Sequence, residues 1–175
     1  MKSQRPKTVQ YRRVRELRTN YSKRLQILLA GKPRLVVRMT NTQVLAQVVE
    51  FTTSGDLVLA AATGKGLRDL GWKYSCKNTP ASYLTGLLIG KAAVKKGLHD
   101  VILDTGVVTP LHKSRLYAFL RGALDAGLAV PHDSEKEIFP SQDRIEGKHI
   151  HLKSDASAAQ KIGSEFAAVK KKIMV

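Results

Sequence analysis

The sequence predicts an α/β fold: a mixed sheet in β-β-β-α-β-α order with helices packed on it, plus a basic N-terminal arm and a helical C-terminal tail. Three segments of strand character follow one another, a long apolar helix leads into a fourth such segment, and a second capped helix comes after it. These three observations predict the fold class. By composition, we divide the chain into an arm over residues 1–18, an α/β core over 19–131 and a polar, partly helical extension over 132–175.

The arm contains no recurring apolar residues, so we expect it to lack regular structure until it binds a partner. Beyond it, a polar cap at Thr19 or Asn20 predicts a short helix. We expect this helix to dock on the core through its apolar face, while Lys23 and Arg24 point elsewhere. That face is formed by Tyr21, Leu25, Leu28 and Leu29.

Three strands are predicted at residues 35–39, 44–51 and 57–62, because these segments are rich in β-branched and other apolar residues. Short turn-forming sequences separate them. The simplest arrangement is therefore an antiparallel meander.

The next segment predicts a buried helix. Thr79 is a natural N-cap, Pro80 suits the first helical position, and Gly97 ends a stretch that is apolar around most of its circumference. A β-branched run at residues 101–103 leaves this helix, which is typical of a central strand entered by a crossover.

The second helix is predicted to begin after a cap at Ser114 and to end at Gly127, with its apolar side chains toward the core. Beyond Pro131 the composition becomes polar. Residues 155–172 nevertheless have the spacing of an amphipathic helix, and we interpret the whole tail as an appendage to the core.

Charge gives the first indication of function. The first 38 residues contain twelve basic side chains and one acid, a local net charge of +11 out of +16 for the whole chain. Such a segment favours a polyanionic partner, and the interleaved Tyr11 and Tyr21 favour nucleic acid with unstacked bases. A solvated charge run or a polybasic patch on a membrane surface is the alternative.

Cysteine usage and hydropathy indicate the compartment. One cysteine, Cys76, excludes an intramolecular disulfide framework and fits a reducing environment. The first twenty residues have no apolar run, and no stretch approaches the length needed to cross a bilayer. We therefore expect a cytoplasmic protein without a signal peptide or a membrane partner.

Two strings imitate catalytic motifs. Asp104-Thr105-Gly106 matches the aspartic-protease signature, but that chemistry belongs to an all-β scaffold, and here a helix begins eight residues past the glycine. We interpret Asp104 as a strand-end aspartate that accepts N–H bonds from its loop. Gly86 and Gly90 resemble a phosphate-binding loop but lie inside a helix, where small residues allow close packing.

The histidines have too few carboxylate or thiolate companions for a metal site, and no nucleophile and base stand in a recognisable context. We therefore expect no enzymatic activity, no cofactor, no metal and no small-molecule substrate.

Five long strings, read together, resemble a known family. They are YRRVRELRTNYSKRLQILLA at 11–30, GKPRLVVRMTNTQVLAQVVEF at 31–51, NTPASYLTGLLIGKAA at 78–93, DVILDTGVVTPLHKSRLYAFLRGALDAGLAVPH at 100–132 and RIEGKHI at 144–150. This pattern is similar to the archaeal form of the large-subunit ribosomal protein L-eighteen family. The resemblance implies a non-enzymatic protein that binds 5S rRNA and attaches it to the central protuberance, in contact with large-subunit rRNA and neighbouring ribosomal proteins.

The residues and the resemblance together predict the RNA-binding positions. Arginine and lysine neutralise phosphates, and RNA is recognised mainly through its shape and backbone. In the arm and first helix we predict phosphate contacts by Arg5, Lys7, Arg12, Arg13, Arg15, Arg18, Lys23 and Arg24, with stacking by Tyr11.

Three further groups are carried over from the family pattern. They are Arg38, Asn41 and Thr42 near the first hairpin turn; His112, Lys113, Ser114 and Arg115 at the entry to the second helix; and Trp72, Lys73, Lys77, Asn78 and Thr79. Ser114 also marks a helix N-terminus, which suits a phosphate. For Trp72, a ring covering the core edge is the alternative to stacking on RNA.

Departures from the family pattern leave two points open. The YSCKN string at 74–78 gives no role to Cys76, and the tail beyond Ile150 matches less clearly. Two other classes of protein remain as alternatives. They are a general nucleic-acid chaperone and, remotely, an aspartic protease that would need two copies of Asp104 in a dimer.

Overall fold

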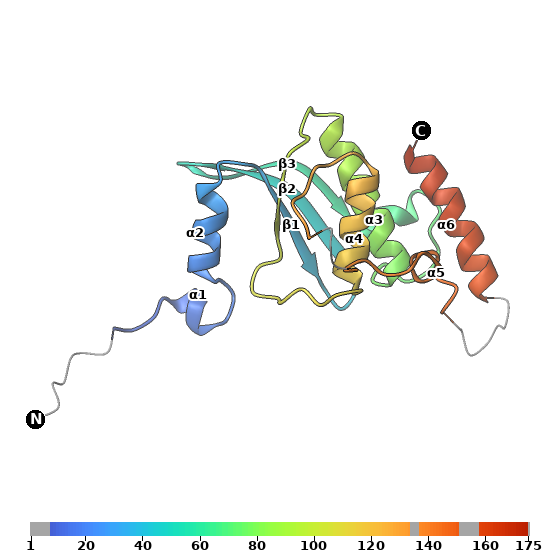
Figure 1. The fold of residues 1–175 in the computed structure, drawn as a ribbon, viewed down its shortest axis with the longest axis horizontal. Helices are drawn as coiled ribbons and strands as arrows, with labels where there is room; N and C mark the ends of the chain where they lie inside the picture. Colours follow the sequence, from blue (N-terminus) through green and yellow to red (C-terminus); the bar gives the residue numbers. More distant parts are fainter. Residues whose placement is uncertain (1–7, 134–136, 151–157, 175) are drawn as a thin grey trace, which may run out of the picture.

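The computed structural model describes residues 8–133, 137–150 and 158–174, and it confirms the α/β class. The core has the predicted β-β-β-α-β-α order, and further helical elements precede, interrupt and follow it (Figure 1). The core elements are β1 (Arg34–Met39), β2 (Val44–Thr52), β3 (Gly55–Thr63), α3 (Thr79–Val94), β4 (Ile102–Asp104) and α4 (Arg115–Asp125). The others are α1 (Arg12–Arg15), α2 (Tyr21–Leu29), the 3-10 helix η1 (Gly64–Arg68), α5 (Gln142–Glu146) and α6 (Ala158–Met174).

The four strands form one sheet in the order β3-β2-β1-β4. Strands β1, β2 and β3 pair antiparallel, as the meander predicts, and β4 pairs parallel to β1. The prediction that residues 101–103 form a central strand is wrong, because β4 lies at the sheet edge. Among the described residues, no second strand pairs with β4, and a single isolated bridge joins Asp100, just before β4, to Ala129. An apolar run indicates that a strand is buried, but it does not indicate whether one or two other strands pair with it.

Helices α3 and α4 pack side by side on one face of the sheet (Figure 1). Alternation along β1 sends Leu35 and Val37 into this core, whereas Arg34 and Arg38 belong to the opposite face. The two helices approach closely through glycine. A Cβ atom on Gly86 would lie 2.0 Å from the carbonyl oxygen of Phe119, which confirms the packing interpretation of this glycine.

The helix caps differ in detail from the sequence prediction. Asn78, not Thr79, is the N-cap of α3, and its side-chain oxygen accepts a 2.9 Å hydrogen bond from the backbone N–H of Ala81. Thr79 is therefore the first helical residue and is buried. Ser114 is the N-cap of α4, as predicted, but its side chain makes no capping hydrogen bond.

The predicted amphipathic helix of the tail is present as α6, and residues 155–157 lie outside the described residues. Its apolar side chains are buried against α3 in a second hydrophobic cluster that also contains Trp72 and Tyr83. These side chains are Ile162, Phe166, Val169 and Ile173. The tail helix is thus part of the packed body rather than an appendage.

The N-terminal region differs most from expectation. Residues 12–15 of the arm form one helical turn, whereas we predicted no regular structure there. Helix α2 begins after Asn20, but most of its apolar face is exposed: Leu25 is 59% and Leu29 77% accessible, Leu28 is only half-buried, and no residue of the helix is buried. The prediction that this face docks on the core is therefore wrong.

Candidate nucleic-acid interface

Helix α2 is attached to the body through the polar side chains that were expected to point away. Lys23 Nζ donates hydrogen bonds to Thr105 Oγ1 at 3.0 Å and to the carbonyl oxygen of Gly106 at 3.3 Å. Arg24 Nη2 lies 3.0 Å from Asp56 Oδ2, at the start of β3. These contacts explain why the leucine face of α2 is turned outward.

Asp56 belongs to a chain of alternating charges on the sheet face opposite α3 and α4. Asp56 Oδ2 also lies 2.8 Å from Nη2 of Arg34. Nη1 of Arg34 then donates to Asp104 Oδ2 at 3.2 Å, and Asp104 Oδ1 lies 3.5 Å from Nη2 of Arg38. We call Arg24, Asp56, Arg34, Asp104 and Arg38 the charge ladder.

Arg34 is the buried centre of the charge ladder, at 2% exposure. Its Nη2–Asp56 distance is that of an ion pair, but the N–H direction falls outside hydrogen-bond geometry, so we treat the contact as an ion pair only. The Nε of Arg34 has no hydrogen-bond partner among the described residues. Burial alone raises the pKa of the Asp56 carboxyl, but the neighbouring guanidinium groups of Arg34 and Arg24 outweigh it, so the net pKa is lowered.

The charge ladder borders a small polar hollow beside α2. Among its lining residues are four predicted RNA-binding side chains from three separate segments: Arg18 from the arm, Lys23 and Arg24 from α2, and Arg38 from β1. Asp104 and Gly106, at the end of β4, line it too. The structure therefore brings together residues that are up to 88 positions apart in the sequence.

The other described arm residues lie on or next to α1 and are exposed. Arg13 Nε donates to Thr19 Oγ1 at 2.9 Å, and Glu16 lies within 3.5 Å of both Arg12 and Arg18. Arg15 is exposed. Tyr11 is 76% exposed, and its ring centroid lies 5.6 Å from that of Tyr21 in a tilted arrangement. The predicted contacts of Arg5 and Lys7 lie outside the described residues.

A second group of predicted residues lies where α3 and α4 begin. Arg115 Nη1 donates to the carbonyl oxygen of Lys77 at 2.8 Å, which holds the two helix N-termini together. Lys77, Asn78 and Arg115 line a common hollow, whereas Lys73 is exposed and pairs with Glu165 of α6. Thr79 lines the same hollow but is itself 7% exposed.

The remaining predicted residues are exposed or partly exposed. Lys113 Nζ pairs with Glu137 at 2.8 Å, and its backbone has a left-handed φ of 56°. His112 packs edge-on against Tyr117. Asn41 and Thr42 form the exposed β1–β2 turn, away from either hollow.

Trp72 does not fit a stacking role. Its side chain is 1% exposed within the second hydrophobic cluster, and its Nε1 donates to the carbonyl oxygen of Ser75 at 3.2 Å. The alternative assignment, in which the ring packs in the core, is the one observed. Cys76 is also buried, with a free thiol.

Sequence reasoning missed the acidic members of the charge ladder as organisers of this surface. Asp104 was expected only to bind its loop, which it does: Oδ1 accepts the N–H of Gly106 at 2.8 Å. Asp56 lies in the short turn-forming sequence between the strands predicted at 44–51 and 57–62, and nothing in that sequence indicates a role on this surface. The available signal was that Arg34 and Arg38 alternate with buried apolar residues along β1, which places two cations on one sheet face.

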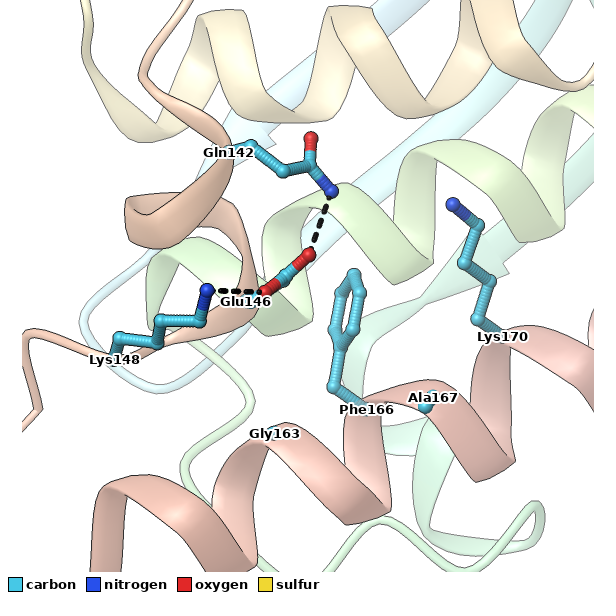
Figure 2. Close-up of a pocket in the computed structure, with 7 residues that line it drawn as sticks. All are labelled: Gln142, Glu146, Lys148, Gly163, Phe166, Ala167 and Lys170. Atoms are coloured by element: carbon cyan, nitrogen blue, oxygen red, sulfur yellow. Dashed lines mark hydrogen bonds and ion pairs between the residues drawn. The ribbon is translucent and has the colours of Figure 1, made fainter.

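Other features of the described residues offer no competing site. Figure 2 shows a hollow between α5 and α6, in which the ring of Phe166 lies between the side chains of Glu146 and Lys170. Gln142 donates a hydrogen bond to Glu146 there, Lys148 forms an ion pair with Glu146, and none of the predicted RNA-binding residues lines the hollow. Across the described ranges, no group of three or more His, Cys, Asp or Glu side chains could hold a metal ion. In the same ranges, no helix is long and apolar enough to cross a bilayer.

Fold and charge together define a basic α/β protein with one strongly cationic end. The family described as "Ribosomal large subunit proteins 60S L5, and 50S L18" matches residues 5–101. The chain is 48% identical over 157 residues to the large ribosomal subunit protein uL18 of Korarchaeum cryptofilum, covering 90% of this chain and 77% of that protein. To uL18 of Methanosphaera stadtmanae it is 42% identical over 159 residues, covering 91% and 81%.

The chain therefore belongs to the uL18 family of large ribosomal subunit proteins. The family resemblance inferred from the sequence is confirmed. Since this is a family of ribosomal structural proteins and not of enzymes, the aspartic-protease alternative is excluded.

Proposed function

We propose that this protein binds 5S rRNA in the cytoplasm and attaches it to the central protuberance of the large ribosomal subunit. The observation that carries the proposal is the meeting of Arg18, Lys23, Arg24 and Arg38 around one hollow, at the end of the molecule where the basic arm begins. Membership of the uL18 family supports it. Large-subunit rRNA and neighbouring ribosomal proteins are the other partners.

Binding is divided between the arm and the body. The exposed guanidinium groups of α1 contact phosphates, and Tyr11 stacks on an unpaired base. The body adds contacts from the hollow beside α2, from the side chains before α3, and from the N-terminus of α4, where Ser114 makes no capping hydrogen bond and free backbone N–H groups favour phosphate. The arm over residues 1–18, the core over 19–131 and the extension over 132–175 are accordingly proposed as separate functional parts.

The test is a binding titration of the isolated protein with a transcript of archaeal 5S rRNA over a range of salt concentrations. Six or more phosphate contacts should give a log–log slope of about −4 or steeper. Transfer RNA is the control competitor. Equal affinity for tRNA would instead identify a general nucleic-acid chaperone, and a slope near zero would exclude phosphate-based binding.

A further inference from the structure

Two carboxylates lie among the basic side chains beside α2. Asp56 and Asp104 alternate with three arginines in the charge ladder, although a surface that attracts a polyanion gains from excluding negative charge. Their presence needs a physical reason other than attraction of RNA.

Stability alone does not supply this reason. Arg34 is 2% exposed, and two of its nitrogens, Nε and Nη2, have no hydrogen-bond partner among the described residues. Burying a paired guanidinium commonly stabilises a protein no more than an apolar side chain of similar volume would. What Arg34 does provide is a fixed link, because it contacts Asp56 on one side and Asp104 on the other.

The outer members of the ladder keep donors available. Nη1 of Arg38 donates to the carbonyl oxygens of Val37 and Asp104, both at 2.8 Å, and Nη2 faces Asp104 Oδ1 at 3.5 Å. A guanidinium has five N–H donors, so the Nε–H and one Nη2–H of Arg38 are not used by these contacts. They lie on the same edge of the group, which matches the bidentate geometry of a phosphate.

Arg24 is held in a similar way from the other side. Its Nη2 contacts both carboxylate oxygens of Asp56, at 3.0 and 3.3 Å, and its side chain is 39% exposed. Both arginines line the hollow beside α2. Arg24 and Arg38 therefore each contact an aspartate through part of the guanidinium group, and the remaining N–H donors can bind a ligand.

We infer that Asp56 and Asp104 are positioning residues, which hold Arg24 and Arg38 in fixed orientations for backbone phosphates of the bound RNA while Arg34 joins the two aspartates. This inference rests on the proposed function. An arginine that is already ordered loses less side-chain entropy when it binds, and this gain exceeds the repulsion from a carboxylate whose charge the arginines neutralise.

In the test of this inference, positioning and charge alone predict opposite changes in RNA affinity. The Asp56→Asn variant removes a negative charge, so charge alone would leave 5S rRNA affinity unchanged or raise it. Positioning predicts that affinity falls, by about twofold to tenfold, because Arg24 must be ordered on binding. The matched control is Asp100→Asn, which removes a carboxylate that lies before β4 and pairs at 3.7 Å with Lys32 outside the ladder. It should bind as tightly as the wild type or slightly tighter.

A double-mutant cycle separates positioning from a general loss of structure. In an Arg24→Gln background, Asp56→Asn should have little further effect, and Arg24→Gln itself should make the salt slope shallower by about 0.7, because one phosphate contact is lost. The corresponding pair, Asp104→Asn with Arg38→Gln, tests the other end. Because Asp104 is buried, circular dichroism first establishes that its variants are folded, and the Asp56 cycle stands without them.

The outcomes are distinguishable from those of the proposed function. If wild-type protein shows no preference for 5S rRNA, the proposed function fails. If the wild type binds and a folded Asp56→Asn variant binds equally or more tightly, or weakens binding to the same extent with and without Arg24, the positioning inference is overturned.

Discussion

On the cationic surface beside α2, the position of a single side chain is determined by contacts with residues that are distant in the sequence. Asp56 follows a short turn-forming sequence, yet it forms ion pairs with Arg24 from α2 and Arg34 from β1. These partners lower the pKa of its carboxyl below the ordinary value of 3.8, although burial acts in the opposite direction. The charged form is thus favoured more in the folded protein than in the unfolded chain.

This shift predicts an acid-sensitive contribution to stability. Because the pKa of Asp56 is lower in the folded protein than in the unfolded chain, ionised Asp56 stabilises the fold at pH values above 3.8, the pKa of the unfolded chain. This stabilisation is lost as the pH falls through the pKa of the folded protein. The difference in unfolding free energy between the wild type and Asp56→Asn should therefore be constant above about pH 5 and shrink at lower pH. Urea unfolding at several pH values measures it. A difference that does not change with pH would contradict the pairing.

At the scale of elements, the packing of α3 on α4 depends on positions that tolerate no side chain. Gly86 faces the backbone of Phe119, and Gly122 of α4 faces the backbone of Tyr83, with a hypothetical Cβ 2.1 Å from the Tyr83 oxygen. Backbone atoms cannot rotate away as the end of a long side chain can. The helices must therefore separate if either position gains a methyl group.

The prediction is that Gly86→Ala destabilises the protein by about 1–3 kcal/mol or more through overpacking. Gly163 provides a matched control in α6, because a Cβ there meets no atom within 4 Å. Gly163→Ala should be neutral or should stabilise by about 0.5–1 kcal/mol, since alanine favours the helix. Chemical denaturation of the two variants compares them. Equal stability changes would contradict the close approach.

Helix α2 shows where prediction from the sequence ends. Periodicity correctly indicated the helix and the residues that share its apolar face, because those depend on neighbours within a few positions. The direction of that face depends on Lys23 and Arg24 meeting Thr105 and Asp56, which are 82 and 32 positions away. Such distant partners leave no local pattern. The same limit applies to β4, whose edge position is set by pairing with β1 alone.

The candidate site also contains features that could be predicted from the sequence and features that could not. The basic residues of the arm and of α2 could be predicted from charge, and the groups at 38–42 and 112–115 from the family pattern. The meeting of Arg18, Lys23, Arg24 and Arg38 around one hollow could not be predicted, nor could the pairing of the arginines with Asp56 and Asp104, since both need the fold. Trp72 was ambiguous because a large aromatic residue beside lysines suits an RNA surface and a core edge equally. Burial at 1% exposure decides for the core.

At the scale of the whole molecule, the described basic residues of the arm and the second hydrophobic cluster lie toward opposite ends. Helices α1 and α2 lie at one end of the long axis, and α6 lies near the other (Figure 1). Among the described arm residues, 8–18, none is buried, whereas α6 places Ile162, Phe166 and Val169 in the second hydrophobic cluster. The two termini therefore differ in what they contribute to folding and to binding.

Deletion of residues 1–18 should consequently leave the melting temperature nearly unchanged while it weakens 5S rRNA binding. Each lost phosphate contact should make the salt slope shallower by about 0.7. The matched control removes residues 158–175 instead, which should unfold or strongly destabilise the protein because several buried side chains are lost. Thermal unfolding and RNA titration on both truncations measure the two effects. Unchanged RNA affinity after deletion of the arm would mean that the body alone, through the charge ladder and the N-termini of α3 and α4, carries recognition.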